Sequence, residues 1–256
     1  MPFAEIAPAQ LMRKLGGPDA PVILDLCLPE DRALDPVVIP TARRMSFADV
    51  PTLAVAGPVV CVCQKGRKIS QGAAAHLRAR GIAAEVLLGG MVAWREAGLP
   101  AIPSDRVPAP GTAWVTRHRP RIDRLAVPWL LRRFVDPEAR ILYAPPADVP
   151  MVAERWGAIP FDHPDADLRD RDGRCTFDAV VDRFDLSHGA LDLMAEVVRA
   201  ADGHGESPQA AGLLALSVGL ARQHGDDAAL LEAAMPLYDA LYRWARDGRD
   251  EQHGHP

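Results

Sequence analysis

The chain has 256 residues, of which 48% are hydrophobic and 25% charged, and its net charge at pH 7 is −5. These values are typical of globular domains, and the length suggests about two of them. The negative charge excludes a bulk attraction to nucleic acid or to an anionic membrane surface. No apolar run is long enough to span a bilayer, and the first residues lack the pattern of a signal peptide, so we expect a cytoplasmic protein.

Strand-like and helix-like segments alternate in the first hundred residues. Apolar runs without alternation are typical of buried parallel strands, and helical spacing of apolar residues marks helices. We predict strands over residues 22–27, 59–63 and 83–88 and helices over residues 7–15 and 71–79. This order indicates a parallel α/β sheet flanked by helices, whose ligand site lies at the carboxyl ends of the strands.

Cys63 lies at the carboxyl end of the second predicted strand. A short loop with one glycine and three cations follows it: Lys65, Gly66, Arg67 and Lys68. Loop amides, nearby cations and a helix N-terminus favour the thiolate, which is the nucleophilic form of cysteine. A phosphatase loop of the Cys-x5-Arg type would need arginine at position 69, where Ile69 stands. The loop therefore suits a group smaller than a phosphoryl group.

This loop resembles the active-site loop of the rhodanese (sulfurtransferase) family. The segment LLGGMVAWREAGLP at residues 87–100 looks like the closing segment of that family, and residues 22–25 look like its early strand ending in aspartate. The resemblance covers residues 5–103. It implies that Cys63 forms a persulfide, that a small sulfur donor and a thiol or cyanide-like acceptor are the partners, and that no cofactor or metal is needed. It also implies a set of substrate-binding residues: Gln64, Lys65, Gly66, Arg67 and Lys68.

The first domain departs from the family pattern at three places. Cys27 stands where the family has the arginine of its Asp-Val-Arg motif. Residues 37–42 stand where the family has a Gly-His-Ile-Pro-Gly-Ala turn. Ile69 stands where the family has a small hydroxyl residue. Cys61 and Cys63 form a C-x-C pair, which could be a metal or redox pair. The alternative, a buried Cys61 with only Cys63 in the loop, is favoured because no histidine or second pair accompanies it.

A proline-rich stretch separates two domains. Three prolines and a closing glycine within residues 103–111 are typical of a linker. We predict a rhodanese-like domain over residues 1–103, a linker over 104–111, a second domain over 112–247 and a polar tail over 248–256. Short strands followed by helices from residue 122 onward indicate that the second domain is α/β at its start and mostly helical later.

The second domain is similar to the chromate-resistance (ChrB) C-terminal domain family. Residues 114–118, 122–124 and 129–139 resemble the start of that family's domain. Residues 172–178 resemble its middle motif, with Asp178 as the acidic residue after phenylalanine. This resemblance implies a role in the response to chromate more than a particular reaction.

Residues 117–133 carry six arginines. They form either a solvated helical face with salt bridges or an oxyanion pocket, since the arginine fork suits oxyanions such as chromate. The pocket would use His118, Arg121 and Arg124. Phosphate contact with DNA ranks third, because no helix–turn–helix signature is clear.

Residues 162–185 carry eight aspartates together with His163 and Cys175. Oxygen ligands of this kind can bind metals, and Cys175 near a helix start could be reactive. Aspartates in loops are more often helix caps and turn formers, and no tight ligand spacing is present. We therefore predict no metal site here and a buried Cys175.

Two functions follow from these patterns. The first is a sulfurtransferase that forms a persulfide on Cys63 and is linked to chromate resistance. The alternative is a chromate-responsive sensor or transcriptional regulator with a non-catalytic or redox-relay rhodanese module. Turnover that disappears with Cys63 would favour the enzyme, and salt-dependent binding to a promoter fragment would favour the regulator.

Overall fold

The computed structural model describes residues 4–248, and the chain divides into two compact units between Val107 and Pro108. This division falls within the stretch that the sequence predicts as a linker. Apart from Gly248, the predicted polar tail over residues 248–256 lies outside the described residues.

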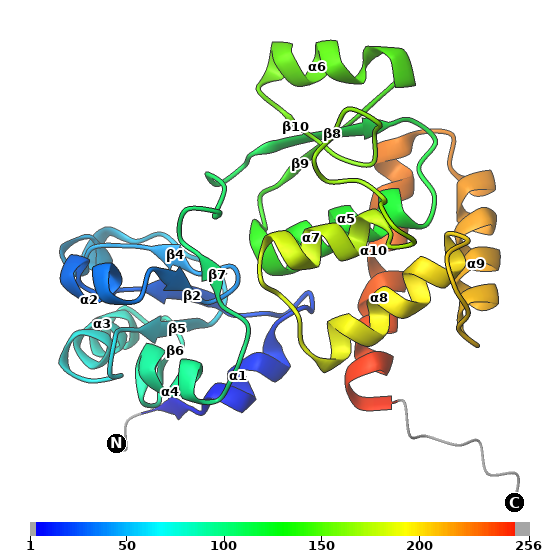
Figure 1. Cartoon of the computed structure of the whole chain (residues 1–256). Coiled ribbons are helices and arrows are strands. Elements are labelled where there is room, and N and C mark those ends of the chain that lie inside the picture. Colours follow the sequence, from blue (N-terminus) through cyan, green and yellow to red (C-terminus); the bar gives the residue numbers. More distant parts are fainter. Residues whose placement is uncertain (1–3, 249–256) are drawn as a thin grey trace, which may run out of the picture. The chain divides into compact units, whose positions relative to one another are not determined.

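The first unit is built on a parallel sheet of five strands in the order β1-β6-β5-β2-β4 (Figure 1). Its strands are β1 (Glu5–Ile6), β2 (Val22–Asp25), β4 (Arg43–Arg44), β5 (Val59–Val62) and β6 (Ala84–Leu87). Its helices are α1 (Pro8–Lys14), α2 (Pro29–Leu34), the 3-10 helix η1 (Phe47–Thr52), α3 (Lys68–Ala79) and α4 (Gly90–Glu96). A separate antiparallel ribbon joins β3 (Val37–Val38) to β7 (Ile102–Pro103).

The central strand β5 is buried over its whole length, as its unbroken apolar sequence predicts. One face of the sheet carries Leu24 and Cys61, which pack with Ala73 and Leu77 of α3. Val60, on the opposite face of β5, is buried as well. The predicted parallel sheet flanked by helices is confirmed.

Helix α3 begins at Lys68, earlier than the predicted start at Gln71. Its first intrahelical bond runs from Gln71 N to Arg67 O, over 2.9 Å. Lys68 therefore belongs to the first helical turn rather than to the loop, and the amides of this turn have no acceptor inside the helix. Apolar periodicity does not reveal such a start, because Lys68 is exposed to solvent.

The second unit contains a parallel sheet in the order β10-β8-β9, with helices on both faces (Figure 1). Its strands are β8 (Ala113–Arg117), β9 (Arg140–Ala144) and β10 (Ile159–Pro160). Its helices are α5 (Asp123–Leu130), α6 (Val149–Trp156), α7 (Thr176–Arg183), α8 (Gly189–Ala201), α9 (Ala210–Gln223) and α10 (Asp227–Arg243), with shorter turns η2 (Leu131–Val135), η3 (Pro146–Asp148) and η4 (Trp244–Gly248). The predicted change from α/β to mostly helical structure is confirmed.

The two faces of this sheet pack differently. Ala113 and Val115 form an apolar cluster with Val149 of α6. The alternate residue Trp114 points to the other face, where its ring lies 6.4 Å from that of Phe184, just after α7. The helices α5 and α7 lie on this second face, on the opposite side of the sheet from α6 (Figure 1).

Pro128 lies inside α5 and leaves a backbone carbonyl without its usual partner. The carbonyl of Arg124 would accept a bond from residue 128, but proline has no N–H. The Tyr143 hydroxyl donates to that carbonyl instead, at 3.5 Å. Past the proline the α-helix continues to Leu130, and the chain then forms the π-helical turn η2.

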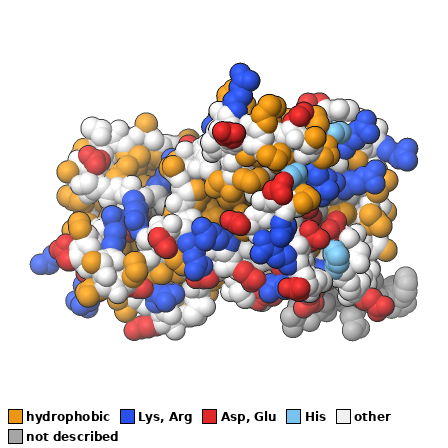
Figure 2. Space-filling view, turned by 45° about the horizontal axis from the view of Figure 1, so that its top comes forward, with side chains coloured by type: hydrophobic (Ala, Val, Ile, Leu, Met, Phe, Trp, Pro, Cys, Tyr) orange, Lys and Arg blue, Asp and Glu red, His pale blue; other side chains and the backbone are white. Residues whose placement is uncertain are grey.

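The surface carries charges of both signs. On the face shown in Figure 2, lysine and arginine side chains are interspersed with aspartate, glutamate and apolar side chains. Within residues 4–248, no helix combines the length and hydropathy that a bilayer-spanning segment needs.

Candidate functional site

Cys63 directly follows β5, at the carboxyl edge of the first sheet. Its side chain is 6% exposed, and its Sγ lies 3.1 Å from the Oγ of Ser70. Ser70 is buried in the first turn of α3, and its hydroxyl donates to the carbonyl of Arg67 at 3.1 Å. A hydroxyl has one proton, so Ser70 can stabilise a negative charge on the sulfur by donating to Sγ in place of the Arg67 carbonyl.

Ser70 was not among the predicted site residues. The family pattern places a hydroxyl residue at position 69, where this chain has isoleucine. The structure brings in the hydroxyl from the next residue, because α3 starts at Lys68 and turns Ser70 toward the sulfur. Ile69 instead packs against the apolar cluster under α3. The serine at position 70 was visible in the sequence, but its direction depended on where the helix begins.

We expect Ser70→Ala to slow alkylation and sulfur loading of Cys63 by about tenfold, because one hydrogen bond to a charged group stabilises it by a free energy of that size. The thiolate would lose the Ser70 hydroxyl as a possible donor, while the fold would keep its apolar packing. Iodoacetamide labelling rates measure the reactivity of Cys63, and thermal melting measures the stability of the fold, so the two measurements distinguish a loss of reactivity from a loss of stability. Ser46→Ala is the matched control, since Ser46 caps η1 through its hydroxyl. An unchanged labelling rate in Ser70→Ala would contradict a role for this hydroxyl.

The loop after Cys63 is held against the start of α4 by backbone hydrogen bonds. Met91 N donates to Cys63 O and Val92 N donates to Gln64 O, each over 3.1 Å. Gly90 and Gly66 make this close approach possible, since both have positive φ, at 61° and 63°. The two sequence motifs that resemble the rhodanese family thus meet in one structure.

The loop residues differ in exposure. Gly66 is buried and Gln64 is half-buried, whereas Lys65, Arg67 and Lys68 are exposed. Within residues 4–248 these three cations form no ion pair with an acidic side chain. Their charge is therefore available to an anion that approaches Cys63.

The other cysteines are fully or nearly buried and uncharged. Burial raises the pKa of Cys61 to about 12. The pKa of Cys27 is raised by burial and then by the neighbouring Asp25, and that of Cys175 by burial and then by Asp123. Buried thiols of this kind are poor nucleophiles.

Asp25 ends β2 and organises the segment around Cys27. Its carboxylate accepts a bond from Cys27 N at 3.0 Å and lies 3.4 Å from Arg32 Nε and 3.7 Å from Arg44 Nε. The family pattern places an arginine where this chain has Cys27. Here Arg32 and Arg44 supply positive charge to the buried carboxylate from other elements.

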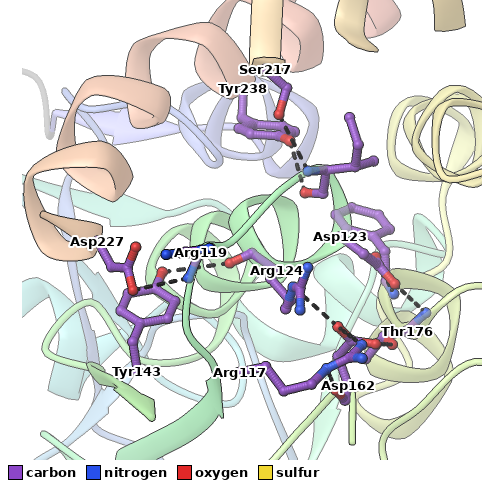
Figure 3. Close-up of polar contacts among 12 residues, drawn as sticks. Arg117, Arg119, Asp123, Arg124, Tyr143, Asp162, Thr176, Ser217, Asp227 and Tyr238 are labelled. Atoms are coloured by element: carbon purple, nitrogen blue, oxygen red, sulfur yellow. Dashed lines mark hydrogen bonds and ion pairs between the residues drawn. The ribbon is translucent and has the colours of Figure 1, made fainter. Parts of the chain in front are cut away.

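The second unit contains a polar cluster at the carboxyl edge of its sheet (Figure 3). Arg117, the last residue of β8, donates from Nη2 to Asp162 Oδ2 at 2.9 Å and from Nε to Asp162 O at 3.0 Å. Arg124, in the first turn of α5, places its Nε 3.4 Å from the same Oδ2. One carboxylate oxygen therefore lies between two guanidinium groups.

The backbone that leads into α5 is strained at Ile122, a β-branched residue with φ 36°. Two side chains from later helices hold it, since Ile122 N donates to Ser217 Oγ at 3.3 Å and the Tyr238 hydroxyl donates to Ile122 O at 2.8 Å (Figure 3). Such strain costs about 1–3 kcal/mol and persists only where the surroundings fix the conformation.

Asp123 lies buried between two helix N-termini. It accepts bonds from Thr176 N at 2.6 Å and Phe177 N at 2.9 Å, which belong to the first turn of α7. Burial, with help from the charges of Asp202 and Asp162, raises its pKa to about 7 despite these bonds. Burial also lowers the pKa of Arg124.

The three predicted oxyanion-binding residues differ in their contacts and in their exposure. Arg124 joins Arg117 and Asp162, whereas Arg121 is exposed and His118 is half-buried. Within residues 4–248 the side chains of Arg121 and His118 make no hydrogen bond or ion pair. Oxyanion binding by His118, Arg121 and Arg124 stays a prediction.

The aspartates of residues 162–185 take part in ion pairs and caps. Asp178 lies 2.6 Å from Arg199 and accepts from Cys175 N at 2.9 Å, and Asp182 lies 3.0 Å from Arg174. Among the described residues, no group of three or more metal-ligating side chains is placed to hold a metal ion.

Comparison with known proteins gives a family for the second unit. The model of the family described as "ChrB, C-terminal domain" matches residues 114–245, just over half of the chain. Protein ChrB of Cupriavidus metallidurans is 30% identical over 134 residues, which are 52% of this chain and 40% of that protein. The chain thus covers less than half the length of this curated relative.

Two of the solved structures to which the chain is similar are the following. A thiosulfate sulfurtransferase from Pseudomonas aeruginosa is 28% identical, with a TM-score of 0.34, over 39% of this chain and 19% of that one. A rhodanese-like domain protein from Staphylococcus aureus is 27% identical, with a TM-score of 0.32, over 36% of this chain and 91% of that one.

Proposed function

The chain belongs to the ChrB C-terminal domain family, and from that premise we propose that it is a rhodanese-type sulfurtransferase that works in the response to chromate. The observation that carries the proposal is the surroundings of Cys63. Its sulfur lies at the carboxyl edge of a parallel sheet, beside the Ser70 hydroxyl and before a helix N-terminus. This arrangement favours a reactive thiolate.

The reaction has two displacement steps. In the first, the Cys63 thiolate attacks the outer sulfur of thiosulfate. A new S–S bond joins that sulfur to Cys63 Sγ as a persulfide, and sulfite leaves with the electron pair of the broken S–S bond. In the second, an acceptor thiolate or cyanide attacks the outer sulfur of the persulfide. The Cys63 thiolate leaves, so the enzyme returns to its starting state without a net change of oxidation state.

The residues around Cys63 support both steps. The free amides at the start of α3 and the hydroxyl of Ser70 can stabilise negative charge on the sulfur that Cys63 carries. The exposed cations Lys65, Arg67 and Lys68 attract an anionic donor toward the loop. The loop is short, because α3 already begins at Lys68, and this favours a single sulfur atom over a phosphoryl group.

Removal of two loop cations tests this electrostatic role. We expect Lys65→Ala with Arg67→Ala to slow sulfur loading from anionic thiosulfate several-fold, and this loss to shrink as ionic strength rises. Loading from a neutral organic persulfide donor is the internal control and should change little. Steady-state rates with the two donors, measured at two salt concentrations, give the comparison. An equal loss with both donors would mean that the cations hold the loop rather than attract the donor.

The direct test of the proposed function is an intact mass after incubation with thiosulfate. The proposal expects one added sulfur atom, which disappears on treatment with a thiol or cyanide. The regulator alternative expects no added sulfur and a strongly salt-dependent binding to a promoter fragment. An unmodified mass together with such binding would make the regulator the better account.

A further inference from the structure

The exposed apolar side chains of the first unit gather at the edge of the sheet that carries Cys63. Within residues 4–107, four large apolar side chains are exposed to solvent: Leu28, Leu34, Phe47 and Leu88. All but Leu34 lie within three residues after the end of a strand, as Cys63 does. The strand order β6-β5-β2-β4 places the segments of these three on both sides of the Cys63 loop (Figure 1). Leu28, Phe47 and Leu88 thus form an apolar patch at this edge.

We propose that the apolar patch is a docking surface for a partner protein, and that a cysteine of that protein, with apolar and acidic residues around it, accepts the sulfane sulfur. This inference rests on the proposed sulfur transfer at Cys63, and it names the class of acceptor. The acceptor thiolate attacks the outer sulfur of the persulfide and forms a new S–S bond to it. The bond between the two persulfide sulfurs breaks, and Cys63 leaves as a thiolate with the electron pair.

Leu88 borders the loop that carries Cys63. The loop packs Gly66 against the backbone on both sides of Leu88, since a Cβ on Gly66 would collide with Leu87 O and would lie 2.9 Å from Gly89 N. The Leu88 side chain is nevertheless 49% exposed, whereas Leu87 is buried. The side chain is therefore next to the loop and available to a partner.

Phe47 and Leu28 approach the same loop from other elements. Phe47 is the first residue of η1, and its half-exposed ring lies against α3, where its Cε2 would be 3.3 Å from a Cβ on Gly72. Leu28 follows β2, the neighbour of β5, and the bonding between these strands extends to Leu26 N, which donates to Val62 O at 2.8 Å. The segments that flank β5 and α3 thus each contribute one exposed apolar side chain.

The depth of Cys63 explains why a protein acceptor would touch this patch. The acceptor sulfur has to come within about 2 Å of the outer persulfide sulfur to form the S–S bond. A free small thiol or cyanide can do so without covering the surroundings of a side chain that is 6% exposed. A cysteine on a protein brings its neighbouring residues onto the same edge, where they would bury apolar surface. Exposed apolar side chains grouped around a reactive site are typical of an interaction surface.

The charge of the loop defines the other property of the partner. Lys65, Arg67 and Lys68 are exposed and, in the described part of the chain, form no ion pair with an acidic side chain. Acidic residues beside the acceptor cysteine would complement these cations, speed the encounter and orient the partner. Apolar and aromatic contacts together with charged groups at the margin are the usual composition of a protein–protein interface.

Single-turnover transfer from the full chain, loaded beforehand with thiosulfate, tests the docking surface. Two peptides of equal length with one cysteine each serve as acceptors. In one the cysteine lies among leucine and glutamate residues, and in the other among serine and glutamine residues. We expect transfer to the leucine–glutamate peptide to be about tenfold faster than to the serine–glutamine peptide. Cyanide, which needs no docking, gives the reference rate for each protein.

Leu28→Ser with Leu88→Ser removes two side chains of the patch at little cost to the fold. Leu28 is the N-cap of α2 and makes no side-chain cap bond, so serine suits this position. We expect the ratio of the leucine–glutamate peptide rate to the cyanide rate to fall about tenfold in this variant. Leu34→Ser is the matched control, because Leu34 is 86% exposed at the end of α2 and lies outside the patch. Its ratio should equal that of the parent.

The outcomes separate a failure of docking from a failure of the reaction. Equal rates of the parent with the two peptides would overturn the docking surface, and this comparison needs no variant. An equal fall of the peptide and cyanide rates in the double variant would also overturn it, since the patch would then support the loop rather than a partner. A Cys63 that takes up no sulfur from thiosulfate would overturn the proposed reaction and this acceptor with it. Normal loading with equal peptide rates would overturn the acceptor alone.

Discussion

Cys63→Ser is expected to abolish sulfur loading from thiosulfate and to remove rapid alkylation near neutral pH. The loss should be on the order of a thousandfold or more, since the variant lacks the nucleophile itself. A serine hydroxyl in this place remains protonated and cannot form a persulfide. Because serine is slightly smaller and Cys63 is nearly buried, we expect the fold to persist.

The remaining cysteines provide the matched controls for this experiment. Cys61→Ser, Cys27→Ser and Cys175→Ser should retain most of the sulfur loading, because burial keeps these thiols neutral and away from donors. Each puts a hydroxyl into an apolar or tightly bonded place, so some loss of melting temperature is expected without loss of reaction. Sulfur loading of Cys63→Ser at the parental rate would end the enzyme proposal.

Gly90→Ala is expected to destabilise the first unit by about 3 kcal/mol or more and to stop sulfur transfer. A Cβ at this position would collide with the carbonyl oxygen of Cys63 and would lie 2.5 Å from Gly66 N. The backbone at Gly90 also has φ 61°, which costs a non-glycine residue further energy. The loop that carries the nucleophile would have to move away from α4.

Gly98→Ala separates backbone strain from the collision. Gly98 has φ 64°, nearly the value of Gly90, but nothing lies within 4 Å of a Cβ placed there. Its substitution should cost only about 1 kcal/mol and leave sulfur transfer intact. Chemical denaturation and thiosulfate turnover of both variants give the comparison. Equal stabilities of the two variants would show that the loop does not depend on contact with Gly90.

The sequence predicted the elements of the first site because their signals are local. The apolar run of residues 59–62 predicts a buried strand, and the cysteine at its carboxyl end with Gly66 nearby predicts a tight loop after it. The resemblance of residues 114–139 and 172–178 to the ChrB C-terminal domain is confirmed by the family match. Patterns of this kind need no knowledge of distant parts of the chain.

The partners of Cys63 and of Arg124 depend on where a helix begins and on which strands are neighbours in the sheet. Ser70 became visible as the partner of Cys63 only with the start of α3, which is set by exposed residues without periodicity. Arg124 was predicted from arginine density, but its partners Arg117 and Asp162 meet it only because β8 and β10 are neighbours in a parallel sheet. The sequence of residues 162–185 does not indicate which of their aspartates lies between the arginines.

The sequence by itself thus determined the two units, their fold classes and the nucleophile candidate, because short-range periodicity, turn residues and motif spacing encode them. The tertiary structure alone decided which hydroxyl lies beside the sulfur and which carboxylate lies between Arg117 and Arg124. It also decided that Ser217 and Tyr238, from α9 and α10, hold the strained Ile122. These outcomes follow from long-range packing, in which the register of strands and the placement of helices choose one partner among many of the same chemistry.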